Sequence, residues 1–189
     1  MPERFIKPIL IIIAIAMLAW ILFWLVFMAS QKKKGIKISF QAEVTFFLFY
    51  VYVIAVMSLT IFPLPFDRLK VPNDNGINIT PVVKTVKGLM EILSTPESLS
   101  TEHIFQNIAG NIVMFIPLGI FLPLLSARYR SGIRVFILSA VCSISIEFTQ
   151  LILRQFEINR TVDIDDVILN TLGALLGFLI IKKLYFTRI

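Results

Sequence analysis

Long uninterrupted runs of hydrophobic residues divide this chain, and polar segments separate them. A helix needs about 20 apolar residues to cross the hydrocarbon core of a membrane, and most of the runs are close to that length. The runs lie at residues 8–29, 44–62, 105–125, 133–153 and 167–181. The last run is short for a span, so we expect its helix to begin within the acidic stretch 163–166 or to lie in a locally thinned bilayer.

This pattern predicts an all-α fold, a polytopic membrane helix bundle of about five transmembrane helices. Of the 189 residues, 57% are hydrophobic and 16% are charged, whereas a soluble domain is about half apolar and a quarter charged. We expect two parts: residues 1–37 with the first transmembrane helix and a basic cytoplasmic loop, and residues 38–189 with a membrane domain. The net charge of +6 does not indicate a nucleic-acid partner, because Lys and Arg cluster beside the runs.

The basic residues beside the runs predict the orientation of the chain. In a five-span arrangement, segments 30–43, 126–134 and 182–189 lie on one side and together carry ten basic residues and one acid. Basic loops remain on the cytoplasmic side of a membrane. We therefore expect the N-terminus outside and the C-terminus in the cytoplasm. Arg4 and Lys7, which precede the first run, argue against this orientation.

A further helix is expected in the long outer loop between the second and third runs. Its apolar residues recur at helical spacing, with Lys84, Lys87 and Glu91 on the other side. The apolar set is Val82, Val83, Val86, Leu89, Met90 and Leu93. An amphipathic helix of this kind either lies in the outer membrane interface or packs over the bundle.

Three of the runs carry polar side chains that hydrocarbon penalises. A carboxylate at the centre of a transmembrane helix costs about 2.5–3.5 kcal/mol, so such groups face the bundle interior and mark functional sites. The third run places Asn107 and Asn111 one turn apart on one face. The fourth and fifth runs also have one polar face each. These faces consist of Ser139, Ser143, Glu147, Gln150 and Arg154, and of Asp163, Asp166 and Asn170.

These polar residues lie at one depth when the runs are placed in a membrane. Asn111 and Glu147 each lie six residues from the outer end of their runs, about 9 Å below the boundary. We therefore predict an outward-open polar pocket floored by Asn111, Glu147 and Asn170, with Arg160 folding back to pair with Glu147. The candidate pocket residues are Asn107, Asn111, Glu147, Gln150, Arg154, Arg160, Asp163, Asp165, Asp166 and Asn170.

Structural roles compete with ligand binding at several positions. One of the three aspartates is expected to cap the fifth helix, whose positive N-terminal end favours acids. Asparagine amides also join helices within membranes, and small residues let helices approach closely. We expect such close packing at Gly110, Gly173 and Gly177. Cys142 is the only cysteine, which excludes an internal disulfide, and no pattern predicts a metal ion or another cofactor.

Several motifs in these polar stretches resemble the VanZ-like family. The matching stretches read NIAGNIVMFIPLG at residues 107–119, EFTQ at 147–150, RTVDIDD at 160–166 and NTLG at 170–173. Asn78-Ile79-Thr80-Pro81 resembles the family's Asn-x-x-Pro element in the outer loop, with Val82 where a Phe often follows. The resemblance extends in order over about residues 46–181.

The resemblance implies a bacterial integral membrane protein of the cell envelope. Founding members of the family lower susceptibility to teicoplanin, a lipid-tailed glycopeptide that binds cell-wall precursors at the outer surface. The family has no agreed catalytic residues, so the resemblance implies none here. The residues at the family's signature positions are Asn107, Asn111, Glu147, Gln150, Arg160, Asp163, Asp166 and Asn170.

The first functional hypothesis is a non-catalytic envelope factor. Its pocket would bind an amphiphilic or lipid-linked cell-wall precursor, or the lipoglycopeptide drug, and contribute to teicoplanin-type resistance. Arg154 and Arg160 would bind phosphate or carboxylate groups of this ligand. The partners would be the lipid bilayer and the ligand, and homo-oligomerisation is left open.

Two further hypotheses belong to other classes. In a membrane-embedded enzyme acting on a lipid-linked phosphate or ester, Glu147 and the cluster of Asp163, Asp165 and Asp166 would supply a general base or hold Mg²⁺. The enzyme hypothesis is the weaker one, because no catalytic motif surrounds His103, the single histidine. In a transporter, Glu147 would bind a proton. No inverted repeat is evident, however, and an oligomer would be needed to build a transport pathway.

Overall fold

The computed structural model describes residues 17–30, 33, 39–60, 77–78, 82–94, 99–154 and 162–186 of the chain. The helices are Met17–Ser30, α2 (Phe40–Thr60), α3 (Val83–Ser94), α4 (Leu99–Leu125), α5 (Gly132–Arg154) and α6 (Ile164–Ile181). The shorter elements are the 3-10 turn η1 (Ala127–Tyr129), the π-helical turn η2 (Lys182–Phe186), and strands β1 (Ile77–Asn78) and β2 (Val162–Asp163). The all-α prediction is confirmed, since the two strands are only two residues long each.

In the part of the chain that the structure describes, four helices are long and apolar enough to cross a membrane. They are Phe40–Thr60, Ile104–Leu125, Gly132–Leu153 and Ile164–Tyr185. The last of these helices begins at Ile164. Its first turn therefore comes from the acidic stretch 163–166, which was one of the two expectations. Of the first expected span, Met17–Ser30 is helical but short, and residues 8–16 lie outside the described residues. Helix α3 occupies the position expected for the amphipathic helix.

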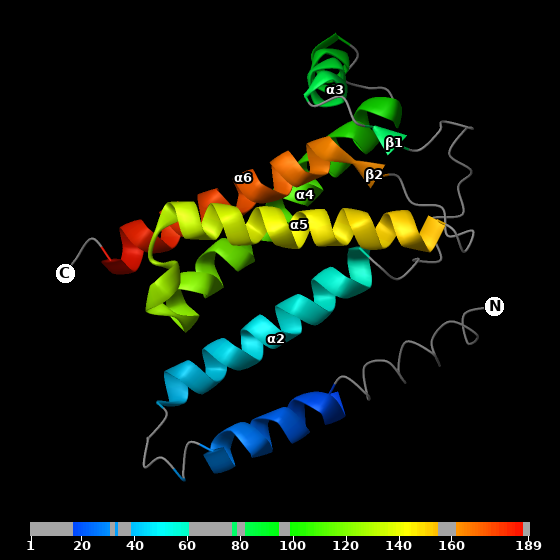
Figure 1. Cartoon of the computed structure of the whole chain (residues 1–189). Coiled ribbons are helices and arrows are strands. Elements are labelled where there is room, and N and C mark those ends of the chain that lie inside the picture. Colours follow the sequence, from blue (N-terminus) through cyan, green and yellow to red (C-terminus); the bar gives the residue numbers. More distant parts are fainter. Residues whose placement is uncertain are drawn as a thin grey trace.

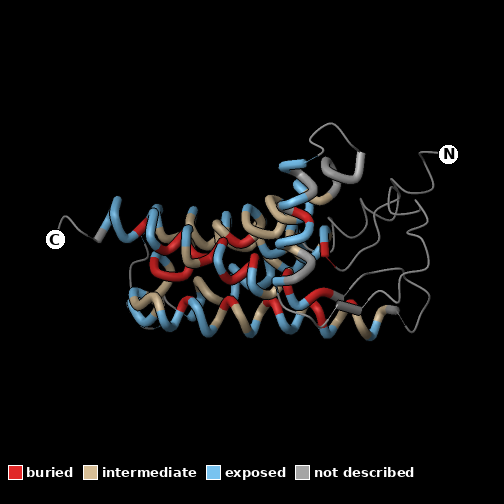
Figure 2. Tube along the Cα trace, turned by 90° about the horizontal axis from the view of Figure 1, so that it is seen from above, coloured by how far each residue is buried: buried red, intermediate tan, exposed pale blue. Residues whose placement is uncertain are grey.

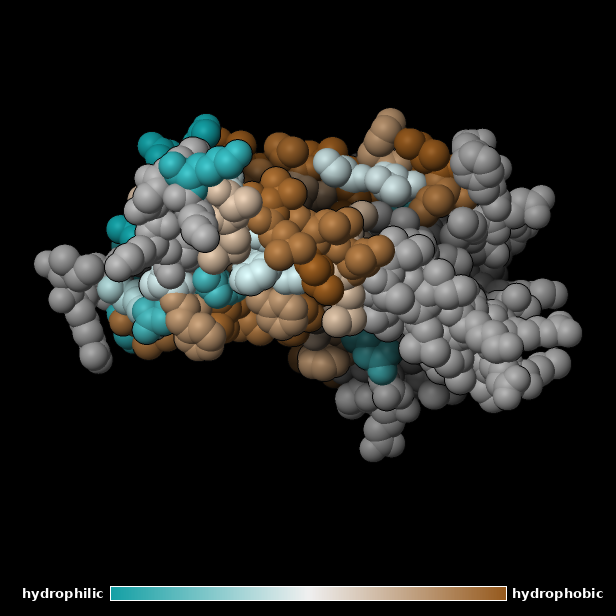
Figure 3. Space-filling view, turned by 90° about the horizontal axis from the view of Figure 1, so that it is seen from below, coloured by the Kyte–Doolittle hydropathy of each residue, from teal (hydrophilic) through white to brown (hydrophobic). Residues whose placement is uncertain are grey.

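Helices α4, α5 and α6 form the centre of the bundle, and α2 lies against α4 (Figure 1). The buried apolar core consists of Phe115, Leu118 and Leu122 of α4, Val135 of α5, and Ala174 and Phe178 of α6. Figure 2 shows that the buried positions gather where these helices meet. On the face shown in Figure 3, hydrophobic side chains gather over the middle of the bundle and hydrophilic ones at the end where α6 finishes. This surface suits a bilayer.

Several helix ends and both short strands meet at one end of the bundle (Figure 1). The end of α2, the start of α4, the end of α5 and the start of α6 lie there, together with α3 and the two strands (Figure 1). We call it the α3 end. At the opposite end, η1 connects α4 to α5, and the Ser126 hydroxyl accepts the N–H of Arg128 at 3.3 Å. The short connection keeps α4 and α5 antiparallel neighbours.

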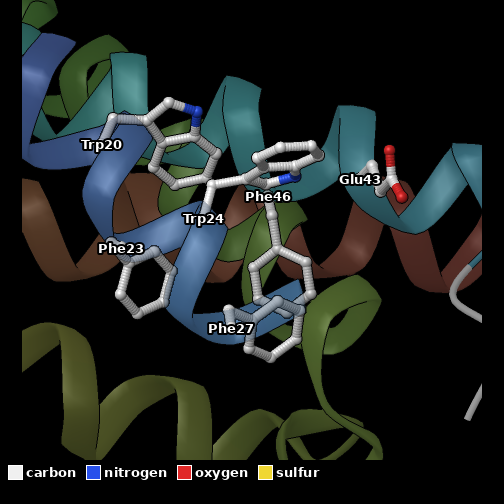
Figure 4. A pocket seen from close by; sticks show the side chains of 6 residues that line it. All are labelled: Trp20, Phe23, Trp24, Phe27, Glu43 and Phe46. Atoms are coloured by element: carbon white, nitrogen blue, oxygen red, sulfur yellow. The ribbon is translucent and has the colours of Figure 1, made fainter. Parts of the chain in front are cut away.

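The Met17–Ser30 helix packs on α2 through aromatic rings. Trp20 stacks on Tyr50 with the ring centroids 4.6 Å apart, and the rings of Phe27 and Phe46 lie 5.8 Å apart. A cavity of about 20 Å³ between the helices has room for about one water molecule. It is lined by Trp20, Phe23, Trp24, Phe27, Glu43 and Phe46 (Figure 4). Its size and aromatic lining indicate packing between two helices rather than a site for a large ligand.

Candidate functional site

The first turn of α6 is closed by the residue that precedes it. Asp163 has an extended backbone conformation, with φ −135° and ψ 120°, and is 2% exposed. Its Oδ1 accepts the backbone N–H of Asp165 at 3.0 Å. The first N–H groups of a helix have no partner within the helix, and an aspartate cap supplies one. Asp163 is therefore the aspartate that caps α6.

Glu147 connects α5 to the segment that leads into α6. The side chain is only 8% exposed, so it faces the bundle and not the acyl chains. Its Oε2 accepts the backbone N–H of Asp163 at 3.0 Å. Strand β2 also pairs in parallel with β1, which places Asn78 opposite Asp163. The end of α5, the segment that leads into α6 and the distant strand β1 thus meet beside Glu147.

Asp165 binds the N-terminus of a different helix, α3. Its two carboxylate oxygens accept the backbone N–H of Val82 and the backbone N–H of Thr85, the latter at 3.0 Å. The Thr85 hydroxyl donates a third bond at 2.7 Å. Val82 has a positive φ of 68°, which is unfavourable for a β-branched residue and indicates a constrained turn. Asp165 therefore caps α3 from α6, a role that its position in the sequence does not reveal.

Asp166 connects α6 to α4. Its Oδ1 accepts the amide N–H of Asn111 at 2.6 Å. The same Asn111 amide nitrogen lies 3.5 Å from Oδ1 of Asn107, which is exposed. The polar face expected on the third run therefore reaches the acidic start of α6 through Asn111.

A second polar contact joins α5 and α6 one turn deeper. Asn170 is 1% exposed, and its amide N–H donates to the Ser143 hydroxyl at 2.8 Å. Among the described residues, its Oδ1 has no hydrogen-bond partner. A buried amide that loses a bond costs roughly 1–3 kcal/mol, so this contact is a sensitive point of the interface between α5 and α6.

Gln150 points towards α2 instead of α6. It is 9% exposed, and its amide N–H donates to the backbone carbonyl of Thr60 at 3.0 Å. Thr60 is the last residue of α2, and its hydroxyl bonds to Val56 within the same helix. Gln150 therefore fixes the end of α2 on α5.

Five of the expected residues meet around the start of α6: Asn111, Glu147, Asp163, Asp165 and Asp166. The residues expected at the pocket floor share this end of the bundle, but each has a different partner. In the described part of the chain, no hydrogen bond joins Asn111, Glu147 and Asn170 to one another. The structure does not describe the side chain of Arg154, and Arg160 lies outside the described residues.

The three aspartates at the start of α6 bind different partners. Asp163 caps its own helix, Asp165 caps α3 and Asp166 binds α4. Within the described ranges, no group of three or more His, Cys, Asp or Glu side chains is arranged to hold a metal ion. The arrangement therefore joins helices. Glu147, which uses one oxygen in its described hydrogen bond, and the exposed Asn107 are among the groups with remaining hydrogen-bonding capacity.

A family model described as VanZ/LLP1 matches residues 49–186, which is more than two thirds of the chain. The chain belongs to the VanZ/LLP1 family. The match contains α3, α4, α5 and α6, and it begins within α2. No significant match was found among curated proteins or among solved structures. Family membership and the four apolar helices together identify a membrane protein.

The motifs of this VanZ-family chain converge at the α3 end of the bundle. Asn111, Glu147 and Asp163 come from three of the motif stretches, and β1 brings Asn78 of the outer-loop element beside them. Asn78 and Asn111 lie far from Glu147 in the sequence, whereas Asp163 is 16 positions from it. The end of the bundle at which they meet is the candidate site of this VanZ-family protein.

Two of the three glycines expected to pack between helices do so. An ideal Cβ at Gly173 would meet the backbone carbonyl of Ile112, and one at Gly177 would meet that of Ile116. Gly110 makes no such contact within the described residues, because the position is exposed and no described atom lies within 4 Å of an added Cβ. Gly119 makes the contact from α4 instead, against the backbone of Ala174. The glycine face of α6 is therefore filled by α4 within one VanZ-family chain.

Sequence reasoning missed several partners of the site residues. Thr85 and Thr60 carried no signal, because threonine is common near helix ends and forms many local bonds. The pairing of β1 with β2 also escaped, since a two-residue strand has no periodicity. Gly119 could have been found by testing every small residue of α4 for a position facing α6.

Proposed function

We propose that this protein lies in the bacterial cytoplasmic membrane and binds an amphiphilic or lipid-linked envelope molecule at the α3 end of the bundle. The ligand would be a lipid-tailed glycopeptide of the teicoplanin type, or the cell-wall precursor on which such a drug acts. Binding would contribute to resistance. The observation that carries the proposal is Glu147, a buried carboxylate in an apolar span that belongs to a polar cluster at one end of the bundle.

The distribution of charge supports an extracytoplasmic position for the α3 end. Exposed basic residues gather at the opposite end, and basic loops stay in the cytoplasm. Six of the seven exposed basic residues in the described part of the chain lie at that end: Lys33, Arg128, Arg130, Arg134, Lys182 and Lys183; the seventh is Lys87 of α3. With a fifth span at residues 8–29, this orientation puts the N-terminus outside and the C-terminus inside. The polar cluster would then lie in the leaflet where cell-wall precursors and lipid-tailed drugs meet.

The groups at the α3 end suit a ligand with a polar head and an apolar tail. Carboxylate and amide side chains bind sugar hydroxyls and peptide amides through hydrogen bonds. Glu147 uses only Oε2 in its described hydrogen bond, and Asn107 is exposed. Below them, Val113 of α4 is 62% exposed and Leu172 of α6 is 47% exposed. The tail of an amphiphile would lie along such apolar faces.

Glu147→Gln tests the proposal with little damage to the fold. The glutamine keeps a carbonyl oxygen that can accept the N–H of Asp163, while the charge is removed. Glu43→Gln is a matched control, because Glu43 lies in the first turn of α2 at the other end of the bundle. Each protein would be expressed at equal membrane abundance in susceptible bacteria without another VanZ-family gene.

We expect the wild-type protein and Glu43→Gln to lower susceptibility to teicoplanin and Glu147→Gln to lose this effect. The wild-type protein should change susceptibility to a glycopeptide without a lipid tail less, because such a drug has no apolar tail to bind the apolar faces of the bundle. Full protection by Glu147→Gln at equal abundance would contradict the proposal.

A further inference from the structure

Helix α3 has one face that is apolar and exposed. Val82 is exposed in the turn before α3, and Val86, Met90 and Leu93 follow at intervals of four and three residues, so these three side chains share one side of the helix. The exposed fractions of the four residues are 49%, 39%, 64% and 84% in chain order. We call these four residues the α3 stripe. A soluble loop helix would bury such a face, so something outside the described chain covers it.

The opposite side of α3 is fixed to the bundle. Gly88 is buried, and an added Cβ there would lie 2.6 Å from Cγ2 of Ile104 in α4. At about 3.6 residues per turn, Gly88 is almost diametrically opposite the centre of the α3 stripe. Asp165 additionally holds the N-terminus of α3 through Val82 and Thr85. The stripe therefore points away from the bundle.

The depth of α3 decides what the stripe faces. Its two attachment points are Ile104, where the apolar part of α4 begins, and Asp165, in the first turn of α6. Figure 1 shows α3 beside the bundle at the level of the first turns of α6, and not beyond the end of α5. When the apolar helices span a bilayer, these positions fall at the boundary between headgroups and acyl chains. A face that points sideways at this depth meets lipid.

We propose that α3 is an interfacial membrane anchor, with Val82, Val86, Met90 and Leu93 inserted at the boundary of headgroups and acyl chains. Continuity with the lipid-facing surface supports this occupant, since Phe105, next to Ile104, is 61% exposed. Lys87 is exposed on the flank of α3, where its ammonium group can reach lipid phosphates. Through Asp165, the anchored helix holds the start of α6, and with it the polar cluster, at headgroup depth.

The test uses the full-length protein in phospholipid nanodiscs, with Cys142→Ala so that each variant has one labelled cysteine. A nitroxide is placed at Leu93→Cys or Met90→Cys in the stripe, and at Lys87→Cys on the flank. Phe105→Cys gives a lipid-facing reference and Arg128→Cys, in η1, gives an aqueous reference. Collision rates are measured with oxygen, which concentrates in lipid, and with a water-soluble nickel complex.

We expect the ratio of oxygen to nickel collisions at Leu93 and Met90 to approach that at Phe105. The ratio at Lys87 should lie several-fold lower, near that at Arg128. Ratios at the stripe equal to that at Arg128 would show that the stripe faces water and would overturn the proposal. Shielding from both reagents, with disulfide formation between unlabelled Leu93→Cys copies, would show that a second copy covers the stripe and would also overturn it.

Discussion

Removal of the Asp165 carboxylate should release α3 from the bundle while the contact between α4 and α6 persists. In Asp165→Ala, two backbone N–H groups and the Thr85 hydroxyl lose their acceptor. Each such bond contributes about 1 kcal/mol net, so docking of α3 should weaken by about 3 kcal/mol. That change corresponds to roughly a hundredfold increase in the equilibrium constant for local opening. The packing of Gly173 and Gly177 on α4 lies deeper and does not involve Asp165.

Amide hydrogen exchange followed by mass spectrometry measures this opening. Exchange in peptides covering residues 82–94 should accelerate roughly a hundredfold in Asp165→Ala, if opening limits exchange. Peptides covering residues 112–122 of α4 should keep wild-type protection. Asp165→Asn retains one carbonyl acceptor and should give an intermediate effect, and Lys87→Ala, an exposed change in α3, should give none. Unchanged protection of residues 82–94 in Asp165→Ala would refute the assignment of Asp165 as the cap of α3.

Two other substitutions test the packing of the bundle. Gly173→Ala should destabilise the protein by about 1–3 kcal/mol in unfolding by a denaturing detergent, because the added Cβ meets a backbone carbonyl of α4. Gly110→Ala should leave stability unchanged or slightly raised, and equal losses in both variants would speak against the close contact. Gln150→Leu should lower stability by about 1 kcal/mol, since it removes the bond to the Thr60 carbonyl. Thr149→Val, which removes a bond within α5 only, should cost less, and the reverse order would contradict the link to α2.

The number and places of the long helices follow from hydrophobic length. Four of the five expected spans appear as long apolar helices, and α3 appears where its 3.6-residue period predicts it. Both properties are local, because a helix in a membrane satisfies its backbone hydrogen bonds within one segment. The start of α6 was open between two interpretations, and the cap at Asp163 decides it.

The candidate site was predictable as a set of residues but not as a set of contacts. Burial of Glu147 follows from the cost of a carboxylate in hydrocarbon, which applies to any packing arrangement. The partner of Asp165 does not follow, since Thr85 is 80 positions away in the chain and no sequence period connects them. Asp165 was expected to line a pocket, whereas its carboxylate caps α3.

By itself, the sequence determined where the long apolar helices lie, and that polar side chains within them such as Glu147 and Asn170 are buried. Those properties depend on the spacing of residues along one helix and on the free energy of transfer into hydrocarbon. The rotation of one helix against another was decided only in the tertiary structure. There Gly119 and not Gly110 meets α6, and Asn170 bonds to Ser143. Helix rotation depends on contacts summed over the whole interface, so no single segment specifies it.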